Sequence, residues 1–361
     1  MYGERRMWRV ATRAAVAVGG VAFLFGALTC GEAPRGELPP AWELRTALPD
    51  KYSAIEALAA CGSDLYIATR EGLERIILKY DGRSFVKVYT APEEYYEYGV
   101  WFRDMAFVGA KGWAVGGTSN PTPPPFNLPF MVRFDGGRWA EVEITDKTLG
   151  SLNEIHPINE DDCWLAGSVN SGVGGQLLKY EGGEFKKYPR GGGYICFARD
   201  SGVIYLPKSR PQPSVFVSAD GGASWTEEAY DVDDFGYVFE SLGRGWAFGE
   251  ELHLLATYRS MVYGIAHRTG PPGEGVYGLA FLEVNDPAFG GLRALAFDDA
   301  GQGVGVGKNA AVYFDGTRWH REELREPVNF DRVTPAAGKG FWASGRALYN
   351  PHGPAGIYFH P

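Results

Sequence analysis

The stretch Val132-Arg133-Phe134-Asp135-Gly136-Gly137-Arg138-Trp139 recurs along the chain in related copies. Each copy has an apolar segment, an acidic residue followed by Gly, and then an aromatic residue. An Asp-Gly pair tolerates the positive φ that a tight hairpin turn demands, and the flanking aromatics pack across the two strands. The motif therefore predicts a β-hairpin. The other copies end at Phe85, Phe185, Trp225 and Trp319.

The copies recur with a regular period. From Phe85 to Trp319 the closing aromatics are 54, 46, 40 and 94 residues apart, and the last step equals two periods of 47 with one copy missing. A second motif, clearest as Gly112-Trp113-Ala114-Val115-Gly116, runs in phase and has seven copies. A period of roughly 40–50 residues with several short strands per unit is typical of a β-propeller. A solenoid is disfavoured because helical periodicity is nearly absent.

We therefore expect an all-β, seven-bladed β-propeller, although the repeats leave six or eight blades open. The expected blades span residues 52–90, 99–145, 149–189, 191–229, 231–284, 289–324 and 328–361. The fifth lacks the acid-Gly turn and carries the insertion 269–275. The chain stops after a third strand at Ile357–Pro361, whereas Ala41–Leu48 resembles a fourth strand with nothing before it. We predict that the N-terminal strand closes the last blade, which removes exposed sheet edges.

Residues 1–30 have the pattern of a signal peptide. Four Arg residues precede the uncharged apolar run 14–28, whose 15 residues are short for a span that needs about 20. Residues 31–40 form a Pro- and Gly-rich linker, and the propeller takes residues 41–361.

The segment ends at Ala27-Leu28-Thr29-Cys30-Gly31, which resembles a bacterial lipoprotein signal with Cys30 as the lipidated residue. Ala27 and Thr29 depart from the Leu and the Gly or Ala of that pattern. Ordinary cleavage and an uncleaved anchor therefore stay open. The resemblance implies an exported protein, either a membrane-anchored lipoprotein of the bacterial cell envelope or a periplasmic or extracellular protein.

The charge balance disfavours several partners. Removal of residues 1–30 takes away four Arg and one Glu, so the net charge changes from −9 to −12. Nucleic acids and anionic lipid surfaces attract basic patches, and we therefore expect neither as a partner. Membrane contact is expected only through a lipid on Cys30, and the protein is expected to be monomeric. Cys61, Cys163 and Cys196 allow either a Cys163–Cys196 bridge with one free thiol or free buried thiols throughout.

One turn carries a family resemblance. Ser218-Ala219-Asp220-Gly221-Gly222-Ala223-Ser224-Trp225 fits S-x-D-x-G-x-x-W, the Asp-box of sialidase-type (BNR-like) propellers. Together with residues 112–116, it is similar to the propellers of photosystem II assembly factors and their bacterial relatives. The resemblance covers most of residues 42–361, with one full Asp-box, and implies a structural role for the turn residues. The early Arg-Ile-Pro-like motif of sialidases is absent, so their catalytic residues are not carried over.

No catalytic, cofactor or metal signature stands out. The six His residues show no ligand spacing, and no G-x-S-x-G elbow is present. Residues 301–308 mimic a phosphate loop, but Asn309 stands where Ser or Thr is required. We predict no catalytic residue, no metal and no cofactor.

Propeller ligands sit at the mouth of the axial channel. Alignment of the innermost strands predicts an apolar column at Ile55, Phe102, Leu152, Tyr194, Tyr237, Leu292 and Phe330. The two positions after it are polar or charged, at Glu56, Arg103, Asp104, Asn153, Glu154, Arg293, Asp331 and Arg332. Charges on an inner strand are costly unless they are paired or wetted. They predict either ion pairs between blades or a ligand-binding mouth.

Two segments should lead into those strands, residues 93–98 and 230–235. They supply six further candidate binding residues, Tyr95, Tyr96, Tyr98, Asp231, Asp233 and Asp234. Tyr beside carboxylates suits a sugar, a cation or a partner protein, and a solvated acidic rim is the alternative.

The leading hypothesis is a non-enzymatic cell-envelope scaffold that binds a protein or carbohydrate ligand at the channel face. The alternative is a carbohydrate-active enzyme, a glycoside hydrolase or lyase, with Asp104 and Glu154 as acid and base at the channel mouth. The two differ in whether those carboxylates face solvent or are paired.

Overall fold

The computed structural model describes residues 42–95, 99–119, 127–146, 148–170, 175–191, 194–208, 214–229, 239–248, 251–258, 262–282, 290–338 and 340–361. For residues 239–244, 248, 257, 258, 262, 263, 281 and 282 it describes the backbone alone. Pro40–Pro361 forms one compact unit. Among the described residues, no helix has the length and apolar character needed to span a membrane.

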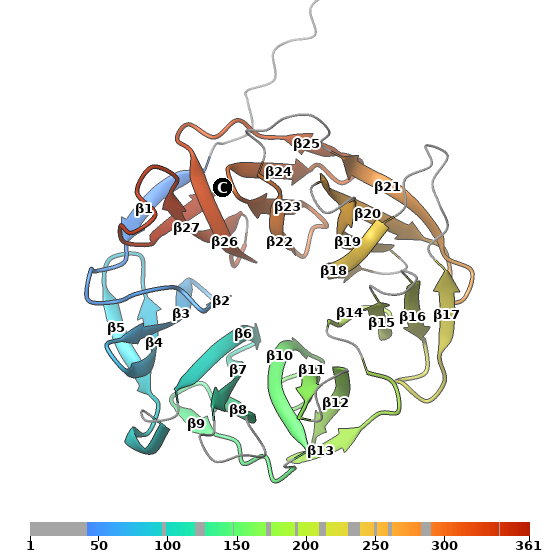
Figure 1. Cartoon of the computed structure of the whole chain (residues 1–361), viewed down its shortest axis with the longest axis horizontal. Helices are drawn as coiled ribbons and strands as arrows, with labels where there is room; N and C mark the ends of the chain where they lie inside the picture. Colours follow the sequence, from blue (N-terminus) through green and yellow to red (C-terminus); the bar gives the residue numbers. More distant parts are fainter. Residues whose placement is uncertain are drawn as a thin grey trace, which may run out of the picture. The chain divides into compact units, whose positions relative to one another are not determined.

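The unit consists of seven four-stranded antiparallel sheets around a common axis (Figure 1). Blade one consists of β2 (Ala57–Cys61), β3 (Asp64–Glu71), β4 (Glu74–Tyr80) and β5 (Phe85–Thr90). Blade two consists of β6 (Val100–Val108), β7 (Lys111–Ser119), β8 (Asn127–Phe134) and β9 (Trp139–Glu141). Blade three consists of β10 (Leu149–Pro157), β11 (Cys163–Val169), β12 (Gly175–Glu181) and β13 (Glu184–Lys187). Blade four consists of β14 (Cys196–Ala198), β15 (Val203–Lys208), β16 (Ser214–Ser218) and β17 (Thr226–Ala229). Blade five consists of β18 (Phe239–Phe248), β19 (Glu251–Tyr258), β20 (Val262–Thr269) and β21 (Val276–Leu282). Blade six consists of β22 (Leu292–Phe297), β23 (Gly303–Gly307), β24 (Ala310–Phe314) and β25 (Trp319–Arg321). Blade seven is β26 (Val328–Pro335), β27 (Phe341–Ala347), β28 (Gly356–His360) and β1 (Glu43–Ala47), and a short 3-10 helix η1 (Glu93–Tyr95) follows blade one.

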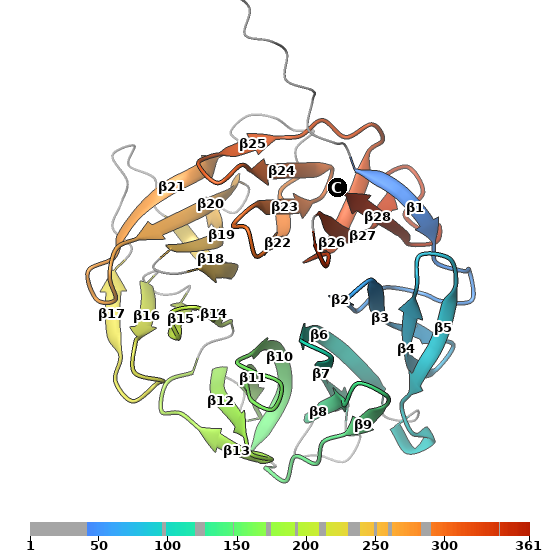
Figure 2. The same ribbon diagram turned by 180° about the vertical axis from the view of Figure 1, so that it is seen from behind.

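The two ends of the propeller share blade seven. β1 pairs antiparallel with β28, with Glu43 opposite Phe359, and Figure 2 shows the two strands side by side. The carboxylate of Glu322, just after β25, accepts a hydrogen bond from Trp42 Nε1 at 2.9 Å. The same carboxylate lies 2.6 Å from Nε2 of His360. The predicted seven-bladed propeller, with its last blade closed by the N-terminal strand, is confirmed.

Blade five has a hairpin in place of the missing acid-Gly copy. Residues 270–275 of the predicted insertion 269–275 form the connection between β20 and β21, and Thr269 ends β20. A buried carboxylate, Glu228 of β17, holds this connection through hydrogen bonds from the backbone N–H of Gly273 at 2.8 Å and of Gly275 at 3.3 Å. The carboxylate of Glu228, from the preceding blade, thus takes the place of the acidic turn residue that the other hairpins contain.

The hydrophobic core consists of layers between neighbouring blades, because each sheet buries its faces against the next. In one layer, Trp139 of blade two packs edge-on against Tyr66 of blade one at 6.1 Å between ring centroids. Burying a large apolar side chain stabilises a fold by about 1.5–3 kcal/mol. Cys61, Cys163 and Cys196 are free thiols, so a Cys163–Cys196 bridge is not formed.

Candidate binding surface on the innermost strands

Four innermost strands share an irregularity at the same place. In β6, β10, β22 and β26 an extra residue interrupts the register with the second strand, namely Arg103, Asn153, Arg293 and Asp331. A second register shift lies earlier in β10, and β18 has register shifts as well. Such β-bulges bend a strand and redirect its side chains. The sequence reasoning identified these residues as charged or polar but did not predict the bulges.

A glycine stands opposite the residue before each bulge. Phe102 pairs with Gly116, and Leu292 pairs with Gly307. A Cβ at Gly116 would lie 1.9 Å from the carbonyl oxygen of Trp101, and one at Gly307 would lie 1.9 Å from that of Gly291. The Gly that closes the second repeat motif is therefore required by the close approach of the bulged strand. That Gly was the available sequence signal for the bulges.

The residue after the bulge connects one blade to the next in blades two and three. Asp104 Oδ2 accepts a hydrogen bond from the backbone N–H of Ile155 in β10 at 3.0 Å. Glu154 Oε2 accepts one from the backbone N–H of Ile195, beside β14, at 2.8 Å, and Glu154 is only 3% exposed. Two of the predicted site residues therefore lie at blade–blade contacts.

Blade one makes the same connection without a bulge. Glu56 Oε2 accepts a hydrogen bond from the backbone N–H of Phe102 at 2.8 Å, and its Oε1 lies 3.1 Å from Arg75 Nε. On its other side, Arg332 of blade seven donates from Nε and Nη2 to the carbonyl oxygen of Glu56 at 3.2 and 3.1 Å. These contacts run from blade seven through blade one to blade two.

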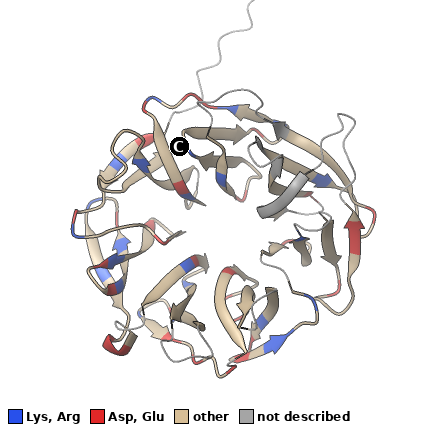
Figure 3. Cartoon of the chain, in the orientation of Figure 1, with Lys and Arg blue, Asp and Glu red and all other residues tan. Residues whose placement is uncertain are grey.

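The bulge residues themselves are more accessible. Arg103 and Arg293 are exposed, while Asn153 and Asp331 have intermediate exposure. Arg293 Nη1 lies 2.6 Å from Asp331 Oδ1 in the next blade, yet both side chains remain almost half exposed. Figure 3 shows both signs of charge on the innermost strands. These exposed groups lie on the innermost strands of four blades and can contact a ligand.

The predicted apolar column is partly displaced. Phe102, Leu152, Leu292 and Phe330 are buried, and Ile55 is 9% exposed. Tyr194 is 37% exposed, whereas the next residue, Ile195, is 1% exposed. The prediction for Tyr194 is therefore wrong by one position, since Ile195, just before β14, is the residue that packs into the core beside Trp164 and Ile204.

The remaining predicted residues lie away from these strands or outside the described residues. The Tyr95 hydroxyl donates to Glu141 Oε2 at 3.2 Å, and its ring packs edge-on against Phe130 at 5.4 Å. Burial and the nearby Glu141 carboxylate raise the pKa of Tyr95 to about 12. Tyr95 is thus half-buried against blade two. Six predicted positions lie outside the described residues: Cys30, Tyr96, Tyr98, Asp231, Asp233 and Asp234, and so does Tyr237 of the apolar column.

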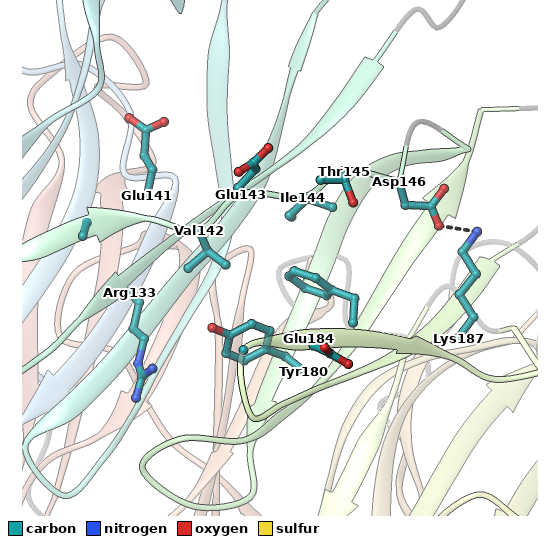
Figure 4. A pocket seen from close by; sticks show the side chains of 13 residues that line it. Arg133, Glu141, Val142, Glu143, Ile144, Thr145, Asp146, Tyr180, Glu184 and Lys187 are labelled. Carbon is teal, nitrogen blue, oxygen red and sulfur yellow. Dashed lines mark ion pairs between the residues drawn. The ribbon is translucent and has the colours of Figure 1, made fainter.

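A groove of about 700 Å³ that the sequence reasoning missed lies between the outer parts of blades two and three. Val142 and Ile144 project into the core between these blades, and Phe185 packs beside them. Glu141 and Glu143 point away from Val142, and the ion pair of Asp146 with Lys187 closes one end (Figure 4). The alternation of polar and apolar residues along 141–145 was the sequence signal for an extended segment with one buried face.

A second missed cluster combines Glu251, His253 and His267. The hairpin of β19 and β20 places His253 directly opposite His267. One ligand atom from each of the three side chains lies within 4.8 Å of the others. The spacing of the His residues along the chain gave no signal for this pair, because His253 and His267 meet only through the register of two strands.

No family model and no curated protein match the chain. Several solved structures are similar to the chain. The chain is similar to YCF48 from Cyanidioschyzon merolae, with a TM-score of 0.59, 16% identity, and coverage of 89% of this chain and 99% of that chain. The likeness is the same for a structure of YCF48 bound to D1 peptide, with a TM-score of 0.60, 16% identity, and coverage of 89% and 98%.

A third neighbour is the Cps50 (Swd1) β-propeller domain of Myceliophteria thermophila, with a TM-score of 0.57, 10% identity, and coverage of 88% of this chain and 99% of that chain. The fold is a seven-bladed β-propeller. The neighbours include photosystem II assembly factor propellers, to which the repeats have a resemblance. At these identities the propeller likeness establishes the fold alone.

Proposed function

We propose that the chain is a non-enzymatic β-propeller of the bacterial cell envelope that binds a protein partner through exposed side chains of its innermost strands. The observation that carries this proposal is that neighbouring side chains at the bulges have different roles. Asp104 and Glu154 hold the next blade, whereas the bulge residues Arg103 and Arg293 stay exposed.

The structural role of Asp104 and Glu154 disfavours the alternative function as a carbohydrate-active enzyme. A glycoside hydrolase needs two carboxylates that flank a substrate bond, about 5–10 Å apart and within reach of it. Glu154 is 3% exposed and accepts a backbone N–H. Asp104 accepts N–H groups on both of its oxygens, from Met105 at 3.0 Å and from Ile155 at 3.0 Å. Their hydrogen bonds suit a structural role better than proton transfer.

A protein partner is favoured over a carbohydrate because the accessible groups are mostly charged. Arg103, Arg293 and Asp331 offer guanidinium and carboxylate groups, which pair with charged side chains or a peptide terminus. In the neighbouring YCF48 structure the propeller is bound to a peptide. By analogy of fold, we infer an extended protein segment as the ligand.

A pull-down from cell-envelope extracts with two charge-matched double variants tests the binding surface. Arg103→Ala with Arg293→Ala removes two cations from the innermost strands. Arg138→Ala with Arg318→Ala removes two exposed cations from outer turns. We expect only the first variant to lose partners that the unmodified chain captures. Equal capture by all three proteins, or no specific capture, contradicts the proposal.

Two further measurements address the enzyme and the localisation. Release of reducing ends from a panel of envelope and plant polysaccharides would support the carbohydrate-active alternative, and we expect none above background. Mass spectrometry of the mature N-terminus is expected to find a diacylglycerol-modified Cys30. An N-terminus at another residue without lipid contradicts the anchored form of the proposal.

A further inference from the structure

We propose that Glu251, His253 and His267 of blade five form a binding site for a divalent transition-metal ion of the Zn²⁺ type. The three residues project from one hairpin. Glu251 and His253 are two positions apart on β19, so their side chains share a face of the strand. His267 stands directly opposite His253 on β20. The sheet therefore brings two imidazoles and one carboxylate together without any long loop.

The distances are close to those of a metal centre. Glu251 Oε2 lies 3.8 Å from His253 Nε2 and 3.6 Å from His267 Nε2. Ligand atoms at about 2.0–2.2 Å from a tetrahedral Zn²⁺ are themselves about 3.3 Å apart. A contraction of a few tenths of an ångström brings the carboxylate into range. The two rings stack at 4.4 Å with planes 17° apart, so the His267 ring must also tilt for both lone pairs to converge.

The accessibility of the three groups suits this rearrangement. The His253 side chain is 4% exposed, that of His267 is 28% exposed and that of Glu251 is 54% exposed. A buried ligand gives the site its rigidity, and an exposed carboxylate gives an ion its entry path. Nε2 of His267 is shielded from solvent and has no hydrogen-bond partner among the described residues. Burying a nitrogen without a partner costs free energy that a metal bond would offset.

The corresponding positions of other blades show what is unusual here. In blade two Arg133 lies over the Trp113 ring at 5.7 Å, and in blade three Lys179 lies over the Trp164 ring at 5.8 Å. His253 and His267 replace such an aromatic and its cross-strand cation. An imidazole lacks the permanent charge of an Arg or Lys side chain, so the attraction between cation and ring is weaker at this position. A shared metal ion would restore a positive charge at this position.

One neighbour competes with the metal. Trp319 Nε1 of blade six donates to His253 Nδ1 at 3.4 Å, which is long for a hydrogen bond. Ligation through Nε2 requires the ring proton on Nδ1, where it would face the indole N–H. The contact must therefore open when a metal binds. Replacing Trp319 by Phe removes the competing donor, and we expect tighter metal binding by that variant.

Isothermal titration of the purified full-length chain with ZnCl₂ at pH 7.5, after treatment with a chelator, tests the site. We expect one ion per chain, with at least a tenfold loss of affinity for Glu251→Gln and for His267→Gln. The Glu251 variant changes an exposed side chain, so it keeps the test valid if a His variant fails to fold. His320→Gln, in blade six, is the control and should bind as the unmodified chain does.

The change in Trp fluorescence on titration provides a second readout, because Trp319 lies beside the site. Stoichiometric binding that Glu251→Gln weakens and Trp319→Phe strengthens supports the proposal. Absence of stoichiometric binding, or binding that Glu251→Gln and His267→Gln leave unchanged, overturns it and assigns the His pair a packing role only. Since no partner protein is needed, this result is independent of the proposed scaffold function.

Discussion

Arg268 of blade five and Glu228 of blade four form a two-bond ion pair inside the propeller. Arg268 Nε lies 2.7 Å from Glu228 Oε2, and Arg268 Nη2 lies 2.7 Å from Glu228 Oε1. Their side chains are 0% and 4% exposed. The guanidinium also donates to the carbonyl oxygens of Gly270 and Pro271 at 2.7 and 2.9 Å, so the pair joins two blades and orders the β20–β21 connection.

Truncation of one partner in this pair is expected to destabilise the fold strongly. Glu228→Ala leaves a buried guanidinium without its anion, and such losses cost about 3–5 kcal/mol. Urea unfolding should show this loss for Glu228→Ala and for Arg268→Ala. The double variant should cost clearly less than the sum, because it leaves no single buried charge. Additive losses would show that the two side chains act independently.

The bulges make the closing Gly of the second repeat motif irreplaceable. At Gly116 a Cβ would lie 1.9 Å from the carbonyl oxygen of Trp101, which is backbone and cannot rotate away. Gly116→Ala should therefore lower the free energy of unfolding by about 1–3 kcal/mol or more. Gly137→Ala is the matched control, since its Cβ would meet only Asp135 Oδ1 at 3.6 Å. Similar urea midpoints for the two variants would contradict the assigned role of the bulge.

The closure of the ring predicts a sharp boundary for truncation. Trp42 and His360 share the Glu322 carboxylate, and β1 supplies the fourth strand of blade seven. A chain that begins at Ala41 should keep the melting temperature of the propeller. A chain that begins at Lys51 exposes the edge of β28 and should melt at least 5 °C lower or aggregate. Differential scanning fluorimetry compares them, and equal melting temperatures would argue against closure by β1.

The turn at residues 218–225 should show a defined pH dependence. Hydrogen bonds from the Ser224 side chain and backbone and from Ser218 lower the pKa of Asp220 to about 2, from an ordinary value of 3.8. Because the folded-state pKa is depressed, the contribution to stability is complete above about pH 4 and is lost as the pH falls through 2. Asp220→Asn should therefore be less stable than the unmodified chain at pH 6. The difference should shrink between pH 4 and pH 2.

Urea unfolding at a series of pH values checks this dependence. Asp299→Asn, an exposed substitution in the β22–β23 turn, serves as the control and should leave the profile unchanged. A difference in unfolding free energy between Asp220→Asn and the unmodified chain that is as large at pH 2.5 as at pH 6 would contradict the stabilising role of the ionised Asp220.

The sequence by itself determined the blade repeat, the hairpin turns and the joining of the chain ends. These features depend on residues close together in the chain, such as Asp135 and Gly136, or on a strand that one end lacks and the other supplies. Turn chemistry and strand alternation are local, so they can be read without coordinates.

Only the tertiary structure decided which inner-strand side chains hold the next blade and which stay exposed. One extra residue in a strand turns the following side chains to the other face. Arg103 and Asp104 are adjacent in sequence, but the bulge leaves Arg103 exposed and directs Asp104 toward the next blade. The acceptor role of Asp104 depends on the N–H of Ile155, 51 residues away in another sheet. His253 and His267 likewise meet only because the register of β19 and β20 sets them opposite each other.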